Sequence, residues 1–226
     1  MKLVEKHIIS KNHESYCEID KISFLSKNLY NKTNYIIRQE FIRTSKEKKA
    51  GKIENAKWIR CNDIQKLLQK ENDADYIALP RKISQQVVMQ LDRNWKSFFQ
   101  SIKKWRKYPN NFTGRPSLPR YKHKTAGRNL LIYTIQAISK PSLEDFVLRL
   151  SGTNIKLKIL HNKIRQARII PLPNKKYKVE VVYEKEIETR STDKNRIASI
   201  DIGLNNLATV TSNVKEFKPL IINGRP

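Results

Sequence analysis

The spacing of the apolar residues changes near Pro109, and this change divides the chain into two kinds of structure. Before Pro109, apolar residues recur every three or four positions, which is typical of amphipathic helices. After it, short alternating runs are separated by Pro, Gly and Asn, which is typical of strands joined by turns. Because helices and strands occupy separate parts of the sequence, we expect an α+β fold.

Helices are predicted over residues 22–41, 58–70 and 84–105, with a lysine-rich turn over residues 45–52. In the clearest of them, residues 84–105, Ser84 is the candidate N-cap. Its apolar face carries Val88, Leu91, Trp95, Phe98 and Ile102. Residues 1–10 alternate in a way that fits one strand, which is too short to fold by itself.

Strands are predicted over residues 129–133, 146–150, 155–159, 168–171 and 177–183, and together they suggest a small β-barrel. In residues 155–159 we expect the isoleucines and the leucine to face the core and the lysines to face away. A polar linker is expected over residues 184–195, and a new domain from Arg196 onward.

The chain carries 46 Lys and Arg against 21 Asp and Glu, a formal charge of +25. Such an excess needs a polyanionic partner, and nucleic acid is the commonest one. A membrane partner is not expected, because no spanning run, signal peptide, lipidation signal or basic amphipathic helix is seen. We therefore expect a cytoplasmic protein.

Cys17 and Cys61 lie in unrelated surroundings and predict neither a disulfide framework nor a zinc site.

The cations concentrate between Arg93 and Leu143, a stretch with twelve Lys or Arg residues and no Asp or Glu. Aromatic residues are interleaved with them, as expected where cations neutralise phosphates and rings stack on bases. Trp95, Phe98 and Phe99 fall on the helical apolar face, so we expect them to be core residues. The predicted nucleic-acid-binding residues are Lys103, Lys104, Arg106, Lys107, Tyr108, Phe112, Arg115, Arg120, Tyr121, Lys122, Lys124 and Arg128.

Residues 114–124 form a turn-rich basic segment with two prolines. The prolines restrict the backbone, so the cations would lose less entropy on binding. A solvated basic linker is the alternative interpretation.

Residues 196–210 place a lone carboxylate, Asp201, in an apolar strand that is followed by a Gly-Asn turn. A buried Asp needs a partner or a metal. Asp201 is therefore either a catalytic metal ligand of a ribonuclease-H-like site or a turn aspartate.

Several of these stretches together resemble the TnpB proteins, the OrfB-type transposase family of insertion sequences. They are residues 25–31, 79–80, 84–87, 94–99, 114–124 and 200–209. The resemblance implies a wedge-like β-barrel that is interrupted by a helical recognition domain and followed by a RuvC-like nuclease domain. The expected boundaries are residues 1–12 for the first barrel strand, 13–112 for the helical domain, 113–190 for the barrel and 191–226 for an incomplete nuclease domain.

The resemblance also implies an RNA-guided DNA endonuclease of transposition and DNA recombination in a prokaryotic, nucleoid-associated setting. Its partners would be a guide RNA from the transposon end and target DNA. Cutting would use Mg²⁺ held by an Asp, Glu, Asp triad, with Asp201 as the first member. The other two carboxylates and the zinc module are expected beyond residue 226, so this chain alone is predicted not to cut. Two alternatives remain open: one piece of a nuclease completed elsewhere, and a catalytically dead RNA-guided repressor or scaffold.

Overall fold

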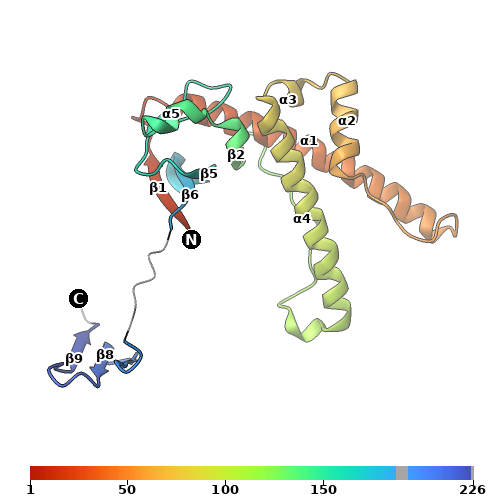
Figure 1. The fold of residues 1–226 in the computed structure, drawn as a ribbon. Coiled ribbons are helices and arrows are strands. Elements are labelled where there is room, and N and C mark those ends of the chain that lie inside the picture. The colour runs from red at the N-terminus through yellow and green to blue at the C-terminus, as the bar shows by residue number, and fades with distance from the viewer. Residues whose placement is uncertain (187–192, 225–226) are drawn as a thin grey trace. The chain divides into compact units, whose positions relative to one another are not determined.

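The computed structural model describes residues 1–186 and 193–224, and the chain divides into two compact units (Figure 1). The first unit, Met1–Lys185, contains helices and two antiparallel sheets. The second unit, Glu186–Pro226, contains a three-stranded sheet among its described residues. This mixture of helices and antiparallel sheets confirms the α+β class.

The longest helix, α1 (Tyr16–Lys49), extends the predicted helix at both ends. The predicted lysine-rich turn is wrong for its first residues, because Lys and Glu are good helix formers and cations are favourable near a helix C-terminus. The helix ends where Gly51 adopts a left-handed φ of 71°. There the Lys52 amide donates to the Glu47 carbonyl and the Gly51 amide to the Lys48 carbonyl, which closes the last turn.

Two shorter helices, α2 (Cys61–Lys70) and α3 (Ala74–Ile77), lead to α4 (Arg81–Lys107). The predicted N-cap is wrong, because α4 begins directly after Pro80, before Ser84 is reached. Ser84 is instead buried within α4, and its hydroxyl donates a 2.7 Å hydrogen bond to the Tyr76 carbonyl of α3. The hydroxyl therefore ties two helices together and does not start one.

The core between α1 and α4 is aromatic. Trp95 is fully buried, as expected, and its ring lies 5.7 Å from Phe41 and 5.8 Å from Phe99 between centroids. Phe98 and Phe99 pack against this core but are only partly buried. The apolar face of α4 therefore changes along its length, from closed around Trp95 to partly open beyond it.

The main sheet joins the two ends of the first unit. Its strands are β1 (Lys2–Ile9), β2 (Leu131–Thr134), β5 (Ile164–Leu172) and β6 (Lys176–Glu184), in the antiparallel order β1-β6-β5-β2. Lys2 pairs with Glu184 and Ile9 with Tyr177, so β1 lies along the whole of β6. The helical segment is thus inserted between the first strand and the rest of the sheet.

A separate hairpin is formed by β3 (Val147–Arg149) and β4 (Lys156–Lys158). Around β4 the expected alternation is confirmed, because Ile155, Leu157 and Ile159 are buried and the two lysines are exposed.

The sequence did not predict α5 (Lys140–Glu144). Short 3-10 turns occur at η1 (Pro109–Asn111), η2 (Ile135–Ala137) and η3 (Pro173–Lys175). The described pairings form an open sheet and a hairpin, so a closed barrel stays a prediction.

In the second unit, β7 (Ala198–Asp201), β8 (Asn206–Ser212) and β9 (Leu220–Asn223) form an antiparallel sheet in chain order. The expectation of a buried first strand is wrong for this unit, because every residue of β7 is exposed. Of the predicted linker, Glu184 belongs to β6, and residues 187–192 lie outside the described residues. Among the described helices, none is both long and apolar enough to cross a membrane.

We predict that Asn34→Ala lowers the free energy of unfolding by about 1–3 kcal/mol, because it leaves the buried Trp95 indole N–H without an acceptor, whereas the Pro119 carbonyl keeps Arg38 as a donor. Asn34 is fully buried in α1, accepts a 3.0 Å hydrogen bond from Trp95 Nε1 and donates a 2.9 Å hydrogen bond to the Pro119 carbonyl. Denaturant unfolding measures the effect. Gln39→Ala, at an exposed site on the same helix, is the control and should change stability little. Equal midpoints for the two variants would contradict the assigned role.

Candidate nucleic-acid interface

Side chains of α1 hold the backbone of the basic segment. Asn31 Nδ2 donates to the Lys122 carbonyl and Asn31 Oδ1 accepts from the Lys122 amide, each at 2.8 Å. Further along α1, Asn34 bonds Pro119 as described, and Lys27 Nζ donates to the Lys124 carbonyl at 2.6 Å. The three α1 residues are spaced by three or four positions and so share one helical face. This face fixes a segment that has no helix or strand of its own.

The side chains of this segment point in two directions: some are exposed to solvent, and Lys122 points toward α1. Arg120, Tyr121 and Lys124 are exposed. Lys122 is half-buried, with its amine 5.1 Å from the centre of the Tyr30 ring, and burial lowers the pKa of Lys122. Lys122 is therefore directed toward α1 rather than toward a ligand in solvent.

The last turns of α4 present the densest group of predicted cations. Lys103, Lys104, Arg106 and Lys107 are all exposed, and none forms an ion pair with a carboxylate of the described residues. Aromatic residues lie close by in the following turn: Tyr108 is exposed, and Phe112 is partly buried. Arg115 is exposed, with its guanidinium 5.8 Å from the centre of the Trp105 ring.

Three of these predicted residues meet in one cavity of about 770 Å³ between the final turns of α1 and α4, here called the fork cavity. Its cations are Lys48, Lys49, Lys103, Arg106 and Arg115, and its apolar lining is Phe41, Phe98, Phe99, Ile102 and Leu118. Lys48 and Lys49 were not predicted as binding residues. The sequence signal for them is the lysine-rich stretch at residues 45–52, which is largely helical and not the expected turn.

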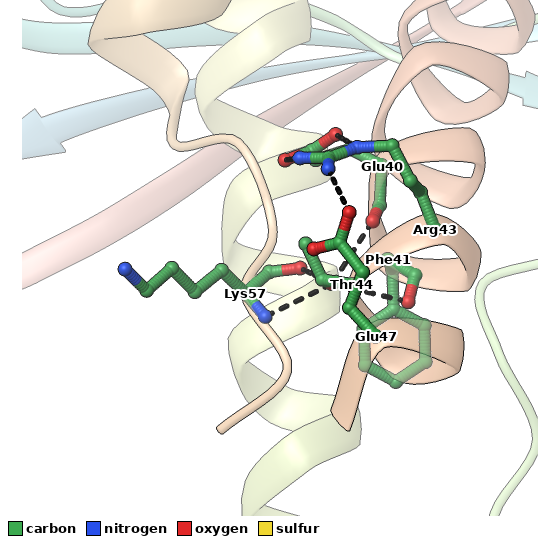
Figure 2. Close-up of polar contacts among 6 residues, drawn as sticks. All are labelled: Glu40, Phe41, Arg43, Thr44, Glu47 and Lys57. Atoms are coloured by element: carbon green, nitrogen blue, oxygen red, sulfur yellow. Dashed lines mark hydrogen bonds and ion pairs between the residues drawn. The ribbon is translucent and has the colours of Figure 1, made fainter. Parts of the chain in front are cut away.

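One wall of the fork cavity is the loop that returns from α1, and Thr44 holds it (Figure 2). The buried Thr44 hydroxyl donates to the Lys57 carbonyl at 2.7 Å and accepts from the Lys57 amide at 3.0 Å. Next to this contact, the Trp58 ring lies 4.3 Å from Phe99 between centroids. A single hydroxyl thus anchors the loop that carries Asn55 and Ala56 into the cavity lining.

The acidic residues of this end of α1 are neutralised within the helix. Arg43 binds Glu40 and Glu47 on either side of it, as Figure 2 shows. The hydrogen bond from Arg43 is the main cause that lowers the pKa of Glu40. Because these carboxylates already have a cation, they offset little of the positive charge of Lys48 and Lys49.

Arg128 lies apart from the other predicted residues. Its Nε and Nη2 donate to the two carboxylate oxygens of Asp20 at 2.8 Å each, and its Nη1 donates to the carbonyls of Thr125 and Gly127. The Tyr177 hydroxyl also donates to Asp20, at 2.6 Å. Arg128 thus joins α1 to the turn at Thr125 and Gly127, and Asp20 links this contact to Tyr177 of β6. It lines a second cavity of about 670 Å³ with Lys11, Lys175 and Lys176.

Asp201 belongs to the second unit, where it ends β7 opposite Thr209 and is exposed. Since it is exposed, it needs no partner to compensate for burial. Within residues 1–186 and 193–224, no three His, Cys, Asp or Glu side chains come close enough together to hold a metal ion.

No protein-family model and no curated protein matches this chain. The resemblance to TnpB proteins, the Mg²⁺ site and the cytoplasmic location therefore stay predictions. The geometry separates the predicted cations into two groups: most are exposed, whereas Arg128 is bound to Asp20 and Lys122 lies against Tyr30.

We predict that Asp20→Asn destabilises the first unit near pH 7 and that this difference shrinks in acid. Hydrogen bonds from Arg128 are the largest cause that lowers the pKa of Asp20, and the Tyr177 hydroxyl adds to it. A carboxylate with a depressed folded-state pKa adds stability above its unfolded pKa near 4 and loses it as the pH falls through the folded pKa. Urea midpoints at a series of pH values from 7 down to about 3 measure the difference. A difference that is constant with pH would contradict the ionic role.

Proposed function

We propose that this chain binds nucleic acid through the exposed cations at the end of α4 and in the basic segment, as the front portion of a TnpB-like RNA-guided DNA nuclease. The observation that carries the proposal is the group of exposed cations with no carboxylate partner among the described residues: Lys103, Lys104, Arg106, Lys107, Arg115, Arg120 and Lys124. Elsewhere in the first unit, many cations are paired with acids, as in Lys96 with Asp92 and Arg165 with Glu184.

Unpaired cations on a folded surface repel one another, and a polyphosphate removes this repulsion and releases its own counterions on binding. The backbone contacts from α1 support the proposal further. They hold Arg120 and Lys124 on a fixed path, so little chain entropy is lost when phosphates bind.

The proposed partners are a guide RNA and target DNA, as the resemblance to TnpB proteins implies. Asp201 is proposed as the first carboxylate of the Mg²⁺-binding triad of that family. For this chain by itself, the function that we propose is nucleic-acid binding.

We predict that the double variant Arg115→Gln/Arg120→Gln weakens binding to single-stranded RNA and makes its salt dependence shallower. Each phosphate contact on a single strand contributes about 0.7 to the slope of log K against log salt, so two lost contacts reduce it by about 1.4. Fluorescence anisotropy over a range of salt concentrations measures both quantities.

The matched control is Lys66→Gln/Lys70→Gln, which removes the same charge from exposed sites on α2. It should leave the salt slope nearly unchanged. If the two double variants changed the slope equally, net charge rather than this surface would govern binding, and the proposed interface would be wrong.

We further predict that Asp201→Ala leaves RNA affinity unchanged, because Asp201 lies outside the cationic surface and in the other unit. The unsubstituted chain with Mg²⁺ and an added guide RNA should not nick DNA. Nicking by the chain that is lost on Asp201→Ala, measured on a supercoiled plasmid, would overturn the assignment of this chain as a binder alone.

A further inference from the structure

We infer that the fork cavity receives one unstacked base of a single-stranded nucleic acid, with the neighbouring phosphates on its rim of cations. The inference rests on the proposed nucleic-acid binding and adds what kind of strand is bound and where. It concerns the cavity between the last turns of α1 and α4, which contains both apolar and basic side chains.

The apolar side chains that line the cavity favour a ligand group with an apolar surface, such as a flat aromatic ring. The rings of Phe98 and Phe99 contact each other, with 5.1 Å between their centres, and each side chain is still partly exposed to solvent. Phe99 is surrounded by Phe41, Trp58 and Trp95, whereas Phe98 contacts only Trp95 and Phe99 among the ring contacts of the described residues. Phe98 thus has fewer aromatic neighbours than Phe99, and we take it as the ring on which a base would stack. A base has an apolar face that would cover it.

The rim determines the charge of that partner. Lys48 and Lys49 come from α1, Lys103 and Arg106 from α4, and Arg115 from the basic segment. No Asp or Glu of the described residues lines the cavity. An apolar floor inside a ring of cations is complementary to a base that carries phosphates on both sides, because the base is apolar at its face and the phosphates are anionic.

The size of the cavity favours a single strand. Its volume of about 770 Å³ lies within the range of about 300–1,000 Å³ that is typical of sites for small molecules, so one nucleotide fits in it. In a duplex the bases are paired and stacked, and a base must be extruded before it can enter such a pocket. In a single strand this energy is small.

The cavity is held open before any ligand binds. The Thr44 hydroxyl fixes the returning loop through both backbone groups of Lys57 (Figure 2). Next to it in the chain, Trp58 packs on Phe99. A preformed pocket loses less entropy on binding than one that must be assembled. The apolar side chains and the cations of the fork cavity therefore need little rearrangement when a base binds.

The test compares two probes, a single-stranded oligouridylate and an abasic strand with the same number of phosphates. The intact chain should bind the base-containing strand about tenfold more tightly, since stacking of one base on an aromatic ring is of this order. Phe98→Leu keeps an apolar side chain but removes the ring. It should abolish the preference and leave both the affinity for the abasic strand and the salt slope unchanged.

A control variant and a second cavity variant distinguish loss of the base pocket from loss of the folded structure. Tyr35→Leu removes an exposed ring of α1 that does not line the cavity, and it should keep the preference. Ser45→Leu places a larger side chain in the cavity lining from α1 and should abolish the preference without removing a ring. Thermal unfolding of each variant verifies that it is folded.

The outcomes separate this inference from the proposed function. If neither strand binds in a salt-dependent way, the proposed nucleic-acid binding fails. If both strands bind equally tightly and Phe98→Leu and Ser45→Leu change nothing, binding stands and the base pocket is overturned. Equally tight binding of poly-glutamate at the cavity, lost on Ser45→Leu, would also overturn it, because an acidic peptide would then be the occupant.

Discussion

The hydrogen bonds between one polar face of α1 and the backbone of the basic segment are the constraint on which the proposed interface depends. Asn31 binds both the amide and the carbonyl of Lys122, and Asn34 joins the same segment to Trp95 of α4. Backbone groups of an irregular segment must find partners, and a helix supplies them at every third or fourth residue. A loop rich in like charges is thereby kept close to the core.

The distribution of charge follows from this arrangement. Where acids and bases meet in the first unit, they neutralise one another locally, as Arg43 does with Glu40 and Glu47. Where the segment between α4 and β2 contains no acids, most of its cations stay exposed and unpaired among the described residues. The same segment supplies Arg115 to the fork cavity. The chain thus separates charge pairs that stabilise the fold from cations that are available to a polyanion.

Much of the fold could be predicted from periodicity alone, because helices and half-buried strands repeat at 3.6 and 2 residues. The alternation around Leu157 is confirmed. The prediction of an N-cap at Ser84 is wrong because a cap and a buried hydroxyl that bonds a neighbouring helix have the same local sequence. The apolar neighbours of Asp201 favour a buried strand, yet β7 is exposed. Neither error could be corrected without knowledge of what packs against each residue.

Local sequence was enough to establish the class of the fold, the position of its main helices and strands, and the excess of positive charge between residues 93 and 143. These properties depend on residues that are near one another in the chain. Tertiary packing was needed to establish which cations are available. It placed Arg128 against Asp20, turned Lys122 toward Tyr30 and brought Lys48 and Arg106 into one cavity. The physical reason is that these contacts join residues far apart in the sequence, and no local pattern encodes their distance.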